Sequence, residues 1–137
     1  MSNLYYYLVP NDYDNMQNPK NEYFIIQELI KINLKIIPIH NSRELNIDLN
    51  PDGIIFNSLK IILNNNQIFD YAKKYKLPLF WWYFDTAKTT LKRKRRVIKI
   101  AMKTSIFFNK DQEYFSHYID LGINPVWLDQ GVPSICK

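Results

Sequence analysis

The most constraining feature of the sequence is an uninterrupted apolar stretch at residues 77–84, LPLFWWYF, which ends at Asp85. A β-strand that is buried on both faces has this continuous pattern, whereas a strand with one face in solvent alternates. The aromatic residues suit a pleated buried surface, and Pro78 fits the first position of a strand, where no ladder donor is needed. The stretch therefore predicts a central strand of a parallel sheet, with helices on both sides.

Shorter apolar runs recur between helical patterns along the chain. We expect strands at residues 5–9, 35–39, 53–57, 77–84, 104–108 and 125–128, and helices at 21–33, 59–75, 87–102 and 111–121. Asn21 is expected to cap the first helix, and the asparagines at 64–66 to split the second, because asparagine is a poor helix interior residue. The alternation predicts one Rossmann-like three-layer α/β domain over residues 1–137. Its six-stranded sheet is mostly parallel, with strand four beside strand one.

Composition excludes several classes of function. With one cysteine, Cys136, the chain can form neither an internal disulfide nor a cysteine-based metal cluster, and a cytoplasmic location is expected. Its three glycines form no phosphate-binding loop or dinucleotide fingerprint, which argues against a self-contained NTPase or nicotinamide enzyme. We identify no bilayer-spanning apolar run and no signal peptide. We therefore expect no bound cofactor and no metal.

Polar residues follow each predicted strand, at the sheet edge where open α/β folds bind ligands. Asp12 and His40 are our candidates for a catalytic role, because a carboxylate or an imidazole can act as a general base. Our candidates for substrate binding are Asn11, Asn57, Asp85, Thr86, Asn109 and Gln130. Helix capping explains any one of these residues at least as well, and a turn or surface role explains His40.

The net charge of +5 is concentrated on the predicted helix at residues 87–102, where residues 92–96 read KRKRR. Such a helix can attract an acidic partner, a membrane surface or nucleic acid. The contacting residues would be Lys92, Arg93, Arg95 and Arg96. A solvated helix face explains the same run, and no recognised nucleic-acid-binding motif accompanies it.

Residues 104–133, TSIFFNKDQEYFSHYIDLGINPVWLDQGVP, give a more specific indication. They resemble the closing segment of the N-terminal domain in GT-B glycosyltransferases, including the spore-maturation-like group. In both, a strand ends in a polar residue, a helix ends in a Gly-Ile turn, and a Trp-Leu-X-Gln-Gly-Val segment follows. The matching positions are Asn109, Gly122, Ile123, Trp127, Leu128, Gln130, Gly131 and Val132. Asp129 stands where the family usually has proline.

The resemblance implies the acceptor-side half of a transferase. In that family the C-terminal domain supplies most contacts to the nucleotide-sugar, and the cleft between the domains is the catalytic site. The chain would then bind a sugar acceptor and pair with a second α/β domain or subunit. It would have little activity alone.

The alternative hypothesis is a non-catalytic Rossmann-like or flavodoxin-like binding module. Its basic helix would dock an acidic partner, a membrane or nucleic acid, so membrane association is an alternative to a purely cytoplasmic location.

Overall fold

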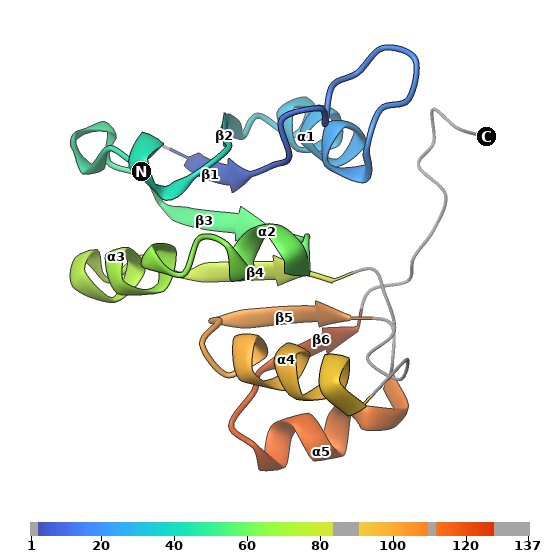
Figure 1. The fold of residues 1–137 in the computed structure, drawn as a ribbon. Helices are drawn as coiled ribbons and strands as arrows, with labels where there is room; N and C mark the ends of the chain where they lie inside the picture. The colour runs from blue at the N-terminus through green and yellow to red at the C-terminus, as the bar shows by residue number, and fades with distance from the viewer. Residues whose placement is uncertain (1–2, 84–90, 110–111, 128–137) are drawn as a thin grey trace.

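All six predicted strands form, and every neighbouring pair in the sheet is parallel (Figure 1). The structure is a computed structural model that describes residues 3–83, 91–109 and 112–127. Helices flank the sheet on both faces, so the expected three-layer α/β class is confirmed. The strands are β1 (Leu4–Leu8), β2 (Lys35–Ile39), β3 (Gly53–Phe56), β4 (Leu79–Trp82), β5 (Ile106–Asn109) and β6 (Pro125–Trp127).

The strand order is β2-β1-β3-β4-β5-β6, so the prediction that strand four lies beside strand one is wrong. β1 is instead paired with β3, with Tyr5 opposite Gly53, and β4 lies on the far side of β3. The reason is the connection at residues 40–52, which contains only two short 3-10 turns, η1 (Ser42–Glu44) and η2 (Ile47–Leu49). It returns the chain past β1 and inserts β3 there. The order β2-β1-β3-β4-β5 is that of flavodoxin-like doubly wound sheets.

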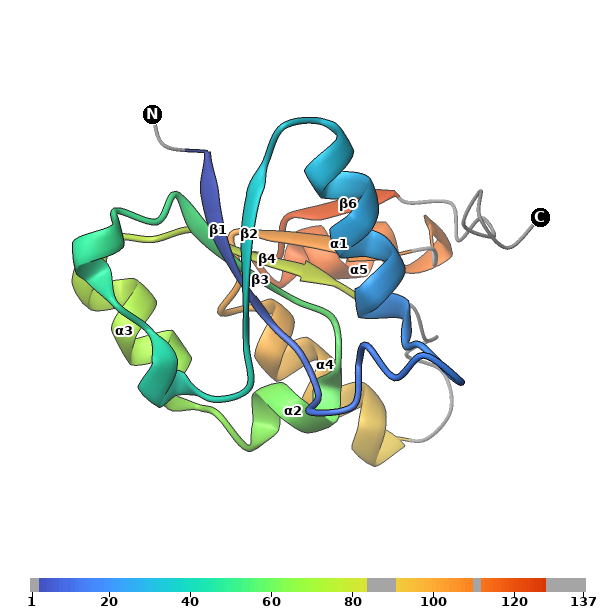
Figure 2. The same cartoon turned by 90° about the horizontal axis from the view of Figure 1, so that it is seen from above.

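Helices cover the two faces unequally. The helices are α1 (Asn21–Lys31), α2 (Leu59–Leu63), α3 (Gln67–Tyr75), α4 (Leu91–Ala101) and α5 (Phe115–Asp120), the last preceded by the 3-10 turn η3 (Gln112–Tyr114). Figure 2 shows α1 on one side of the sheet and α2, α3 and α4 on the other. The predicted break at the three asparagines is confirmed, since it separates α2 from α3. Lys20, not Asn21, is the N-cap of α1, and it makes no side-chain capping bond.

The larger of the two cores lies beneath α2–α5. Trp81 is fully buried there, with its ring centroid 5.7 Å from that of Phe56 and 4.9 Å from that of Phe107. The smaller core, on the α1 side, contains Tyr7 and Ile26. Gly53 lets β3 and β4 approach, because a Cβ at this position would lie 2.8 Å from the Phe80 ring and 3.1 Å from the Pro78 carbonyl oxygen.

β4 differs in one respect from the strand that its apolar run predicts. Leu79 and Trp81 are buried beneath α2–α5, whereas Phe80 and Trp82 are only half-buried on the α1 side. Among the described helices, α1 alone covers that face, and its buried residues share their core with Tyr7 and Ile55, on β1 and β3. The run therefore predicted the central position of β4 correctly but overstated the cover on its second face.

Candidate ligand-binding site

The sheet has its topological switch point between β1 and β3. The chain leaves β1 toward α1 on one face, and leaves β3 toward α2 on the other, so the two connections diverge and open a crevice at the carboxyl edge. A cavity of about 540 Å³ lies there, within the roughly 300–1,000 Å³ typical of ligand sites. We call it the switch-point cavity. Its polar lining includes Asp12, Lys20, Glu22, Asn57, Lys60 and Arg93.

Glu22 is a buried carboxyl group on the wall of this cavity. It is 5% exposed, and burial raises its pKa, an effect that the Asn57 amide and Lys20 partly offset. Asn57 lies on the same cavity wall, and its side-chain oxygen accepts a 2.8 Å hydrogen bond from the Tyr7 hydroxyl. Tyr7 is completely buried, which raises the pKa of its phenol and keeps it a donor. The Tyr7 hydroxyl therefore fixes the Asn57 amide on the wall that Glu22 shares.

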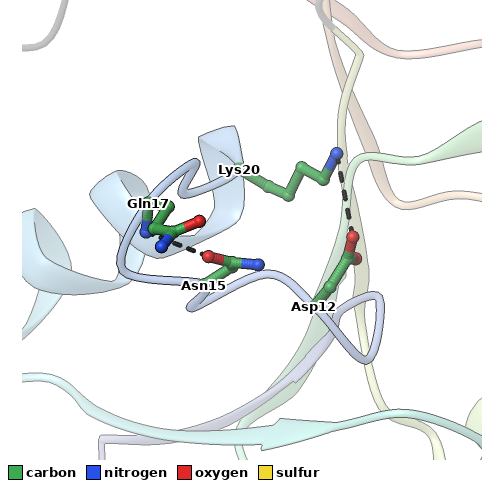
Figure 3. A network of polar contacts seen from close by, with 4 residues as sticks. All are labelled: Asp12, Asn15, Gln17 and Lys20. Atoms are coloured by element: carbon green, nitrogen blue, oxygen red, sulfur yellow. Dashed lines mark hydrogen bonds and ion pairs between the residues drawn. The ribbon is translucent and has the colours of Figure 1, made fainter.

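The loop between β1 and α1 also lines the cavity. The Asp12 carboxylate and the Lys20 ammonium lie 3.9 Å apart at the two ends of this loop (Figure 3). The backbone of Lys20 also donates to the Tyr13 carbonyl at 2.9 Å, and the amide of Gln17 donates to Asn15 Oδ1 at 2.9 Å. The loop is therefore folded on itself and presents Asp12 and Lys20 at the carboxyl edge.

A second hollow of about 450 Å³ adjoins the switch-point cavity, between α2 and α4. We call it the basic groove. Four cations line it, namely Lys60, Lys92, Arg93 and Arg96, together with Leu59, Leu63 and Asn64. No carboxylate is among the described residues of its lining. Leu59, Lys60, Asn64 and Arg93 line both hollows, so the two form one continuous depression.

Arg93 stands where the two hollows meet. Its Nε donates to the Tyr83 hydroxyl at 3.0 Å, and Tyr83 is itself 2% exposed. The anchoring tyrosine belongs to the segment directly after β4, so a buried part of the sheet positions a guanidinium group on α4. A guanidinium held in this way is suited to bind phosphate or carboxylate, because less side-chain freedom is lost on binding.

The structure brings together only part of the predicted site. Asp12, Asn57 and Arg93 line the switch-point cavity, and Lys92 and Arg96 line the basic groove. Asn11 and Arg95 are exposed and line neither hollow among the described residues. Asp85, Thr86 and Gln130 lie outside the residues that the structure describes.

Two further candidates have structural partners instead. His40, at the end of β2, is half-buried, and its Nδ1 lies 3.2 Å from the Val9 carbonyl oxygen. Its backbone amide donates to Glu44, which closes a capping box with Asn41 on the turn that follows. Asn109 is 1% exposed and donates its amide to the Tyr83 carbonyl at 3.2 Å. Both therefore hold the edge of the sheet together.

Sequence reasoning missed three residues of the site, Lys20, Glu22 and Lys60. In the sequence, Glu22 has the pattern of an acidic residue in the first turn of a helix, and Lys60 lies in a helical pattern with no neighbouring motif. One available signal was the long polar loop before α1, since long loops often carry functional residues. The decisive information was the strand order, because it places the starts of α1 and α2 on either side of one crevice.

Two further observations limit the chemistry of the described residues. Among them, no three His, Cys, Asp or Glu side chains lie close enough together to hold a metal ion. Within the same ranges, no helix has the length and apolar character to cross a membrane.

No protein-family model, curated protein or solved structure matches the chain. We therefore infer a function from the geometry of the two hollows and from the resemblance described above.

Proposed function

We propose that this domain binds a small anionic ligand in the switch-point cavity and the basic groove. The observation that carries the proposal is the convergence of Lys20, Lys60 and Arg93 on one concave site at the switch point. Doubly wound sheets bind their ligands at this position, and clustered cations lower the free energy of a bound anion. The fold alone does not determine the ligand, so the proposal depends on these side chains.

A concave site favours a small ligand over a polymer or a membrane. Lys92 and Arg96 lie four residues apart on one side of α4 and face α2, whereas Arg95 is exposed away from both hollows. Docking of an extended acidic surface would use Arg95 as much as its neighbours, because an extended polyanion contacts the exposed charges of a helix. A small anion would use only the residues that line the depression.

The test is calorimetric titration of the purified chain with inorganic phosphate and with a short acidic polymer. We expect phosphate to bind, and Arg93→Gln to weaken its binding about tenfold to a hundredfold, since a charged hydrogen bond contributes about 1.5–3 kcal/mol. Arg95→Gln is the matched control on the same helix and should leave phosphate affinity unchanged. Equal losses in the two variants, or binding of the polymer alone, would favour the basic-helix docking module instead.

A second candidate function is the acceptor-side domain of a GT-B-type glycosyltransferase. The buried Glu22 carboxyl on the cavity wall favours it, because a carboxyl group with a raised pKa is suited to take a proton from a sugar hydroxyl. On this proposal a second α/β domain or subunit supplies most of the nucleotide-sugar contacts. The chain alone should then bind a neutral oligosaccharide more tightly than a nucleotide-sugar and transfer nothing. The reverse order of affinity, or transfer by this chain alone, would contradict it.

A further inference from the structure

The two adjoining hollows differ in chemistry. The described lining of the basic groove contains cations and apolar side chains but no carboxylate. The switch-point cavity adds Asp12, Glu22, Asn57 and Ser58, which are side chains that accept hydrogen bonds from hydroxyl groups. One continuous depression therefore has an anion-binding half and a hydroxyl-binding half, with Lys60 and Arg93 at their junction.

From this division we infer that the ligand is a phosphorylated polyol, such as a pentose or hexose phosphate, with its phosphate in the basic groove and its hydroxyl groups against Asp12 and Glu22. The inference rests on the proposed anion-binding function and specifies its ligand class. Phosphate is the group that suits two arginines and two lysines, because guanidinium groups bind its oxygens in pairs. A free inorganic anion has no hydroxyl groups of a sugar to contact Asp12 and Glu22, so it would leave these two side chains without a function in binding.

The position of Glu22 supports a role in binding hydroxyl groups of the ligand. Carboxyl groups beside an anion site repel the ligand, so the presence of Asp12 and Glu22 there is explained if they contact its hydroxyl groups. Glu22 is 5% exposed and lines the cavity beside Asn57, which the Tyr7 hydroxyl holds at 2.8 Å. A carboxyl group has two oxygens that accept hydrogen bonds, so Glu22 can bind a ligand hydroxyl.

The lining also distinguishes a polyol phosphate from a nucleotide. Binding of a base normally uses an exposed aromatic ring for stacking. Among the described residues that line the two hollows, the one aromatic side chain is Tyr83, which is 2% exposed and bonded to Arg93. The described part of the depression therefore offers no exposed ring for a base.

The test compares three probes by calorimetry: ribose 5-phosphate, inorganic phosphate and ribose. We expect ribose 5-phosphate to bind roughly tenfold more tightly than inorganic phosphate, because one or two added hydrogen bonds contribute about that factor, and ribose to bind too weakly to detect. Arg96→Gln should weaken both phosphates about equally. Lys73→Gln, on α3 and outside both hollows, is the control for the loss of a positive charge.

Glu22→Gln and Asp12→Asn provide the decisive comparison. Each removes a negative charge beside the anion site, so inorganic phosphate should bind equally well or more tightly. Ribose 5-phosphate should lose about threefold to tenfold, because a hydrogen bond from a sugar hydroxyl is weakened. Opposite responses of the two probes cannot come from a general loss of structure.

The outcomes separate this inference from the function on which it rests. If inorganic phosphate binds in an Arg93-dependent way and ribose 5-phosphate binds no more tightly, the polyol inference is overturned and the anion site stands. If both probes gain affinity in Glu22→Gln, the carboxyl group only repels, and the inference is again overturned. If neither phosphate binds, the proposed function fails together with the inference.

Discussion

At the scale of single residues, Glu22 shows that a binding-site residue can have the same sequence pattern as an ordinary acidic residue at the start of a helix. An acidic residue in the first turn of a helix is expected on electrostatic grounds alone. Here the same side chain is 5% exposed, and it lines a cavity together with Asn57, which accepts a hydrogen bond from the buried Tyr7 hydroxyl. Burial of the ionised form opposes folding, so the position of Glu22 is better explained by function than by stability.

The unfavourable free energy of burying the ionised Glu22 carboxyl group predicts how stability depends on pH. Because burial raises the pKa of Glu22 in the folded state, the folded protein holds this proton more tightly than the unfolded chain does. The resulting stability is fully present below the unfolded pKa and is lost as pH rises through the folded pKa. Replacing Glu22 by glutamine removes this decrease in stability at higher pH. Urea unfolding should give equal stability for variant and wild type at about pH 4, and a more stable variant at about pH 7.

Glu28→Gln is the matched control for this experiment. Glu28 lies on the same helix, is exposed, and forms an ion pair with Lys31 at 3.1 Å. Exposed pairs of this kind contribute about 0–1 kcal/mol, so the Glu28 variant should show little gain between the two pH values. A Glu22 variant that loses stability at neutral pH would show that the ionised carboxyl stabilises the fold.

At the scale of helices and strands, local sequence signals were most reliable where a specific residue type is required. The asparagines after α2 end that helix, and Gly122, with φ of +83°, ends α5 in the left-handed region, as predicted. The start of α1 was less predictable. Asn21 has the right side chain for a cap, yet the chain turns into the helix at Lys20, because the loop is tied back through the Lys20–Tyr13 backbone bond.

The end of α3 provides a prediction at this scale. Lys76 closes the helix with φ of +54°, a left-handed conformation that disfavours a residue with a Cβ atom. Lys76→Gly should therefore raise the free energy of unfolding by about 0.5–1 kcal/mol, measured by urea denaturation. Lys73→Gly, inside the same helix, should lower it by about 1 kcal/mol. If both glycine variants are destabilised equally, the left-handed cap at Lys76 is incorrect.

For the whole molecule, the fold class followed from the apolar runs, but the site did not. Six runs alternating with helical patterns are sufficient to predict a parallel three-layer sheet, because few other arrangements bury them. The strand order depends on how the connection at residues 40–52 crosses β1. This connection contains almost no helix, so its sequence has no periodicity from which to predict the crossing. The strand order determines where the switch point lies. Without it, the sequence identified Asp12 and Asn57 as site residues but not Glu22, Lys20 and Lys60.

The described residues also line a second basic depression, and only the one at the switch point is required to be the site. The second, of about 520 Å³, lies between α3 and the start of β5 and is lined by Lys73, Lys76 and Lys103. It is at the opposite edge of the sheet from the switch point. If positive charge alone recruited anions, the two depressions would compete for the same ligand.

Mapping of backbone amide shifts by NMR during titration with ribose 5-phosphate is the most direct test of where the ligand binds. We expect saturable shifts that cluster at residues 20–22, 57–60 and 92–96, with the amides around Lys73, Lys76 and Lys103 unchanged. Shifts that cluster around those three lysines, or that are spread over all exposed basic residues without saturation, would contradict a ligand site at the switch point.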